Sequence, residues 1–125
     1  MVDSVIAWNG LAHQEPGLVL LDTSRSVVKH NRLSGNGSSG VLLAGRSEMN
    51  RLMHNETTDN VGAGIVVADA NENALRGNQV RRNGDGVVVS GDGNRMSANS
   101  VDQALGCPGD GCGSGISVRG AQVTS

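Results

Sequence analysis

The sequence repeats itself every 22 to 24 residues along most of its length. A glycine followed by a short aliphatic run occurs five times, and the intervals between successive glycines are 23, 24, 22 and 29 residues. These runs begin at Gly17, Gly40, Gly64, Gly86 and Gly115. Periods of this size are typical of stacked architectures, because one repeat cannot bury its apolar side alone and its neighbours supply the rest. The period therefore predicts a solenoid.

Asparagine marks the same repeat. In the stretch MNRLMHNETTDN, residues 49–60, Asn recurs at every fifth position. The five-residue spacing is found along the chain at Ser4/Asn9, Ser26/Asn31, Asn50/Asn55, Asn73/Asn78 and Asn94/Asn99, with a further Asn at Asn36, Asn60 and Asn83. Aligning the pairs with one another places Asn9 beside Asn31 of the next repeat. Three sets of aligned positions then share one period: the glycines, the pairs five residues apart and the third Asn.

An asparagine ladder would explain this spacing. Asn tolerates the unusual φ of a tight turn, and its amide can satisfy backbone groups there. Each side-chain amide can also donate a hydrogen bond to the Asn of the next repeat, as in the ladders of cross-β structures. We therefore predict that these residues are scaffold and not ligand-binding groups.

The residues available for a core favour short strands. Phe and Tyr are absent, Trp8 is the one indole, and the frequent valines suit a pleated sheet. Each repeat reads as three very short strands joined by turns, for example 41–43, 51–53 and 56–58, and none shows a helical period. We predict an all-β parallel solenoid of about five coils, with three strands per coil, as one domain over 1–125. Because the chain begins and ends within repeats, we expect a fragment of a longer repeat protein.

The repeats resemble those of the right-handed parallel β-helix proteins, the pectin-lyase-like group. Three segments carry the resemblance: SVVKHNRLSGN (26–36), EMNRLMHNETTDN (48–60) and NENALRGNQVRRNGDG (71–86). The group includes the periplasmic nitrous-oxide-reductase accessory protein and many carbohydrate-active enzymes. The resemblance covers residues 4–125 and implies the right-handed fold. It also implies that a polysaccharide or a copper-accessory role is to be considered.

One outward column carries rings and charges next to the central Asn residues. We expect Trp8, His30 and His54 to lie one above another, because each directly precedes an Asn. Such a strip could bind a sugar face or supply acid and base groups, and a solvated turn is the alternative. The resemblance implies the same chemistry, since lyases and epimerases on this scaffold place Lys, Arg, His and carboxylates on one sheet. The predicted ligand-binding residues are Trp8, Lys29, His30, Arg32, His54 and Glu56.

Acidic residues do not form a recognisable catalytic or metal-binding motif. Glycoside hydrolysis needs two opposed carboxylates, and the candidates Asp69, Glu72, Asp85 and Asp92 fall mostly in predicted turns. The stretch NGDGVVVSGDGN (83–94) is similar to glycine- and aspartate-rich calcium repeats, but its nine-residue period is not sustained. We predict no metal site and no cofactor.

The last repeat contains an inserted loop over residues 104–114. Within it, Cys107 and Cys112 bracket a Pro-Gly-Asp-Gly turn that can bring the two sulfurs into bonding range. We predict a local disulfide, with free thiols as the alternative. An oxidised pair would indicate an exported protein.

A second outward column is aliphatic. It contains Val19, Leu42, Val66 and Val88 and ends at Ser117. A contiguous apolar stripe usually meets a partner, whereas scattered surface valines are ordinary. We predict a homo-oligomer that forms through this sheet face or through the open ends of the coil stack.

The charge and hydropathy of the chain narrow the function. The formal net charge of −2 argues against a nucleic-acid-binding domain, and no apolar run is long enough to span a membrane. We favour a noncatalytic recognition or structural module, associated with carbohydrate and extracellular or periplasmic. A polysaccharide lyase, epimerase or glycoside hydrolase, or a fragment of one, is the alternative. A copper-accessory role is weaker, since it would depend on two separated histidines and four Met residues.

Overall fold

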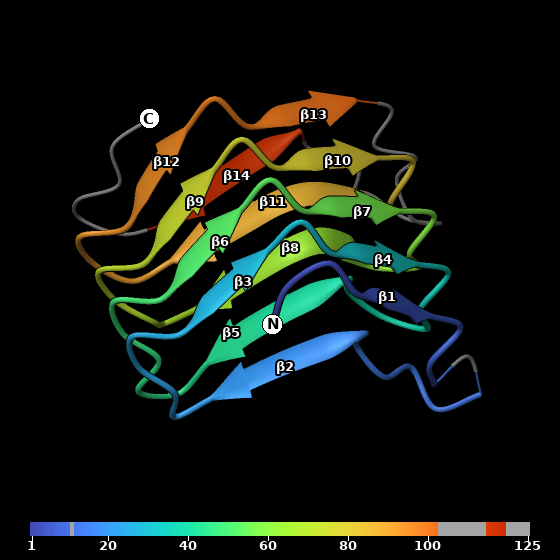
Figure 1. Cartoon of the computed structure of the whole chain (residues 1–125), viewed down its shortest axis with the longest axis horizontal. Coiled ribbons are helices and arrows are strands. Elements are labelled where there is room, and N and C mark those ends of the chain that lie inside the picture. The colour runs from blue at the N-terminus through green and yellow to red at the C-terminus, as the bar shows by residue number, and fades with distance from the viewer. Residues whose placement is uncertain (11, 103–114, 120–125) are drawn as a thin grey trace.

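The computed structural model describes residues 1–10, 12–102 and 115–119, which wind into a parallel β-helix (Figure 1). The predicted all-β solenoid is confirmed: within these ranges, fourteen short strands form three parallel sheets. The part of the chain that the structure describes holds no helix able to cross a membrane.

The three sheets form the walls of the helix, and each complete coil after the first contributes one strand to each wall (Figure 1). Sheet A contains β3 (Val27–Lys29), β6 (Arg51–Met53), β9 (Ala74–Arg76) and β12 (Arg95–Ser97). Sheet B contains β1 (Val5–Ala7), β4 (Arg32–Ser34), β7 (Glu56–Thr58), β10 (Gln79–Arg81) and β13 (Ser100–Asp102). Sheet C contains β2 (Leu18–Leu21), β5 (Val41–Ala44), β8 (Ala63–Ala68), β11 (Asp85–Ser90) and β14 (Ile116–Arg119).

The first coil differs from the prediction in its phase. The backbone N–H of Asn9 donates to Oδ1 of Asn36, and that of Ser4 donates to Oδ1 of Asn31. Asn9 therefore lies beside Asn36 and not beside Asn31. The five-residue spacing occurs twice in each of the next three repeats (26–36, 50–60 and 73–83), so spacing alone does not choose between the two alignments. Because the chain enters in sheet B, the described residues make about four turns and not five.

The interior is filled by aligned aliphatic columns. In sheet A the middle residue of each strand points inward, and all four are buried: Val28, Leu52, Leu75 and Met96. Thr57 occupies the matching column of sheet B between Leu33 and Val80. Its hydroxyl is buried without a hydrogen-bond partner among the described residues. The buried members of the sheet A column and the neighbours of Thr57 in sheet B are apolar, so short strands with one inward residue each are enough to fill this part of the core.

Asparagine ladders join successive coils, as predicted. Asn55 shows the pattern: its backbone N–H and its Nδ2 both donate to Oδ1 of Asn78, at 3.0 and 3.1 Å. Oδ1 of Asn55 accepts the same two bonds from Asn31, and Nδ2 also donates to the carbonyl of Val28 at 2.9 Å. Each amide thus binds to the coils on both sides.

A positive φ is found at the residue before each ladder Asn. His30 and His54 have φ angles of 54° and 53°, and Asp59 and Arg82 have 56° and 49°. None of the described Asn residues has a positive φ, so the prediction that Asn adopts it was wrong. The Asn side chain must point inward to reach its ladder, so the chain reverses at the preceding residue, whose side chain faces outward.

We predict that an Asn in the interior of a ladder contributes more to the free energy of unfolding than an Asn at the end of a ladder. Asn55→Ala leaves several buried groups without partners, so the free energy of unfolding should fall by roughly 3 kcal/mol. Asn9→Ala is the matched control, because Asn9 is exposed and, among the described residues, its side chain donates only to Asn36. It should cost less than about 1 kcal/mol. Urea unfolding followed by circular dichroism measures both, and equal losses would contradict the ladder's role.

Candidate ligand-binding groove on sheet A

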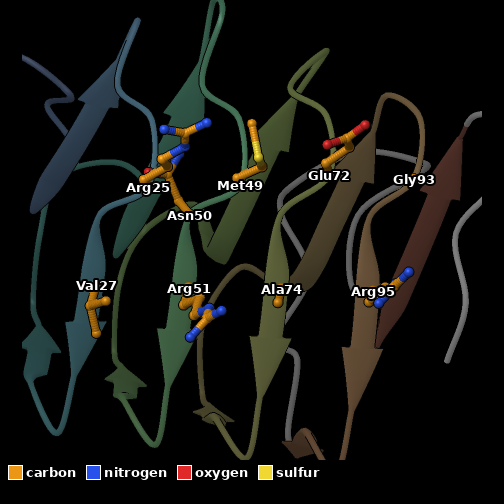
Figure 2. A pocket seen from close by; sticks show the side chains of 9 residues that line it. All are labelled: Arg25, Val27, Met49, Asn50, Arg51, Glu72, Ala74, Gly93 and Arg95. Atoms are coloured by element: carbon orange, nitrogen blue, oxygen red, sulfur yellow. The ribbon is translucent and has the colours of Figure 1, made fainter.

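The outward face of sheet A is hollowed into an open groove of about 730 Å³ (Figure 2). Its lining comes from two rows, the turn residues before sheet A and the first residue of each strand. The lining residues are Arg25, Val27, Met49, Asn50, Arg51, Glu72, Ala74, Gly93 and Arg95.

The floor of the groove follows from strand register. Arg51 and Arg95 both pair with Ala74, which lies on the strand between them (Figure 2). All three precede a buried core residue, so the alternation of a strand turns them outward. The methyl group of Ala74 leaves open space between the two long arginine side chains.

The rim of the groove follows from the turn geometry. Arg25, Met49, Glu72 and Gly93 have φ angles of 57°, 56°, 53° and 67°. Each precedes the Ser or Asn that leads into sheet A. The reversed backbone faces these side chains outward while the following residue joins the ladder. The same turn therefore places one residue in the ladder and the residue before it at the rim of the groove.

Positive charge dominates the groove. Arg25, Arg51 and Arg95 are exposed, and none of their side chains pairs with a carboxylate in the part of the chain that the structure describes. Glu72 is the one acidic residue among the described lining residues. A guanidinium group presents a planar fork of donors that matches a carboxylate. The groove can therefore accept an anionic ligand.

A different part of the surface holds a strong ion pair, in which both charged groups come from this chain. On the sheet B side, Arg82 donates two hydrogen bonds to Asp59, each of 2.7 Å. This bond holds the pKa of the Asp59 carboxyl below its usual range, and the neighbouring charges of Arg82 and Arg32 act in the same direction. The two groups neutralise each other, so they offer little to an external ligand.

Most of the predicted ligand-binding residues lie along the corner between sheets A and B. The rings of His30 and His54 have centroids 5.6 Å apart and planes tilted by 32°. Arg32 Nε lies 3.8 Å from Glu56 Oε2 on the first outward column of sheet B. Lys29 ends β3 on sheet A. Their ligand-binding role remains a prediction.

Trp8 lies elsewhere. It follows β1 of sheet B and donates its backbone N–H to the carbonyl of Ser34. Its indole lies over Gly35, where an added Cβ would come within 2.6 Å of the ring. The expected stack of Trp8 on His30 is therefore not formed. The cause is the phase of the first coil, which moves Trp8 to the next corner.

The sequence-based prediction missed Arg25, Arg51 and Arg95. A signal was present, because Arg51 and Arg95 each directly follow a ladder Asn. Of the acidic candidates, Glu72 lines the groove, whereas Asp69, Asp85 and Asp92 do not. Cys107 and Cys112 lie outside the described residues.

Comparison with known proteins identifies the family. The sequence profile of NosD, described as periplasmic copper-binding protein, matches residues 2–120. The chain belongs to the NosD family. This assignment confirms the β-helix resemblance, and no curated protein matches the sequence.

Solved structures support the fold of this NosD-family chain. A mutant of the periplasmic alginate epimerase AlgG is similar with a TM-score of 0.73 and 23% identity, over 81% of this chain and 24% of the epimerase. Another AlgG structure gives a TM-score of 0.68 and 22% identity, over 78% and 24% of the two chains. This chain therefore spans about a quarter of the epimerase's length.

The aliphatic stripe of the NosD-family chain is aligned as predicted. Val19, Leu42, Val66 and Val88 pair in register across sheet C, and the column continues to Ser117. Val19 is exposed and the next three side chains are half-buried. A partner on this face remains a prediction.

The stripe predicts self-association that a charge should abolish. If two copies meet through sheet C, the chain should sediment as an oligomer at low micromolar concentration. Val66→Asp should then yield a monomer, because association would bury an unpaired carboxylate. Val61→Asp places the same charge on an exposed residue outside the stripe and should leave the oligomer intact. A monomer for the unmodified chain would contradict the interface.

Proposed function

We propose that this chain is a noncatalytic β-helical module that binds an anionic polysaccharide in the groove of sheet A. The main observation in support is that Arg25, Arg51 and Arg95 line one groove and have no carboxylate partner among the described residues. Pendant carboxylates of uronic acids suit such donors, because each can accept two parallel hydrogen bonds from one guanidinium.

The comparisons support this class of ligand and its location. AlgG is named as a periplasmic alginate epimerase, and alginate is a polymer of uronic acids. The NosD family is described as periplasmic. We propose that this chain also acts in the periplasm or outside the cell, where it would meet such polymers.

Nucleic acid fits the chain less well. The formal net charge is −2 and the sequence pI is about 5.8, so the molecule as a whole repels a long polyanion with dense charge. No aromatic ring is among the described residues that line the groove, whereas single-stranded nucleic acid is usually held by stacking. A local cationic groove instead suits a polymer with widely spaced charges.

The groove does not hold a pair of catalytic groups. Its described lining includes one carboxylate, Glu72, and no histidine. Glycosidases need two carboxylates on opposite sides of the scissile bond, and lyases or epimerases need a base beside the substrate. The enzyme hypothesis would therefore depend on the corner of His30 and His54, outside the groove. Binding without turnover is the simpler function of the groove itself.

Copper does not fit the described residues. The family description names this metal, and imidazole nitrogens suit it. Yet no group of three or more His, Cys, Asp or Glu side chains in the described ranges could hold a metal ion. His30 and His54 form a pair, and Nδ1 of His30 lies 3.5 Å from the Asp3 carboxylate, an exposed contact. We assign no copper site to them.

The proposal predicts charge-selective binding. Calorimetry should show the chain binding a hexamer of mannuronate and not a neutral glucan hexamer, with affinity falling as salt rises. Arg51→Ala with Arg95→Ala should lower the affinity about tenfold, or about 1.4 kcal/mol. Arg46→Ala with Arg81→Ala is the matched control, because both residues are exposed and neither lines the groove. Equal losses in the two double variants would contradict binding in the groove.

Glu72→Gln separates binding from catalysis. Removal of the like charge should tighten binding of the mannuronate hexamer by about two- to threefold, because less repulsion opposes the ligand. No new double bond or epimerised sugar should form with either protein. Turnover by the unmodified chain that Glu72→Gln abolishes would identify an enzyme instead.

A further inference from the structure

The cations of sheet A follow a regular pattern that extends beyond the groove. Each strand of the sheet has two outward positions, its first and its third residue. The first column contains Val27, Arg51, Ala74 and Arg95. The second column contains Lys29, Met53, Arg76 and Ser97. Every strand therefore carries one cation, none carries an acid at these positions, and the cation changes column at each successive strand.

The register converts this pattern into a zigzag in space. Neighbouring strands lie about 4.8 Å apart, so Lys29, Arg51, Arg76 and Arg95 advance by about that distance per coil along the helix axis. The two columns are two residues apart along each strand, which separates them by roughly 6.6 Å. Four cations thus alternate between two sides of a line that runs along the axis, over roughly 14 Å. The neutral residue beside each cation leaves room for an uncharged part of the ligand.

We propose that this zigzag selects an extended, twofold β-(1→4)-linked polyuronate that lies parallel to the helix axis, with about one sugar per coil. This inference rests on the proposed function and specifies its ligand. In a twofold chain each sugar is turned over relative to the last, so its carboxylates point alternately to the two sides. A pyranose unit in such a chain advances by nearly the spacing of one coil. Successive carboxylates would therefore meet Arg51, Arg76 and Arg95 in turn.

The zigzag includes one of the predicted ligand-binding residues and lies next to others. Lys29, one of the predicted ligand-binding residues, occupies the second column at the N-terminal end of the zigzag. The second column borders the corner that holds His30 and His54. Arg76 is exposed and pairs in register with Met53 and Ser97, both uncharged. No described ion pair involves Lys29 or Arg76, so both can meet a ligand.

A charge-conserving rearrangement tests the zigzag. The double variant Ala74→Arg with Arg76→Ala keeps the net charge and the number of arginines but places three arginines in the first column. Both changed residues face outward, and a thermal melt should confirm that the coil stack is intact. We expect affinity for a mannuronate hexamer to fall about tenfold. The unmodified chain should gain affinity with oligomer length up to four sugars and then level off.

Linkage and polymer class provide the remaining readouts. The unmodified chain should prefer the mannuronate hexamer at least fivefold over a hexamer of α-(1→4)-linked galacturonate, whose carboxylates do not alternate in this way. The rearranged variant should lose that preference. Equal binding of mannuronate by both proteins would overturn the zigzag while leaving groove binding in place. Tighter binding of single-stranded DNA or of a sulfated glycan would also overturn it. Failure of the proposed function itself would appear separately, as no effect of Arg51→Ala with Arg95→Ala.

Discussion

The asparagine amide that bonds to the coils on both sides of it is the interaction on which this structure depends. A carboxamide has both a donor and an acceptor, so one side chain can receive bonds from the coil before it and donate to the coil after it. Asn60 does this, accepting from Asn36 and donating to Asn83, and it is buried. A buried amide without such partners would be costly, so the ladder fixes the position of each coil relative to the next.

Fixed coil positions make the surface as regular as the core. Once the ladders set the register, residues more than twenty positions apart become neighbours on the outward face. Arg51, Ala74 and Arg95 form the groove floor only because Asn50, Asn73 and Asn94 hold the preceding corner. The function of such a surface is therefore encoded as columns across the repeats and not as a local motif.

The same physics explains which predictions succeeded. The strands at 51–53 and 56–58 were found because the repeat leaves segments between turns that are too short for helices. The phase of the first coil was missed because the Asn spacing repeats within a coil. The groove was missed because its arginines are separated in sequence, and their proximity depends on register. The positive φ was assigned to Asn because Asn often adopts it, whereas the inward ladder requires the strain to fall on residues such as His54.

Exchange of asparagine side-chain amide protons, followed by NMR, tests the ladder most directly. The bonds of Asn55 and Asn60 run between coils and are buried, so their Nδ2 protons should exchange only when the whole molecule unfolds. The exchange rate should then track the global free energy of unfolding as urea is added. Nδ2 protons of Asn55 and Asn60 that exchange as fast as those of a free asparagine side chain would contradict the account.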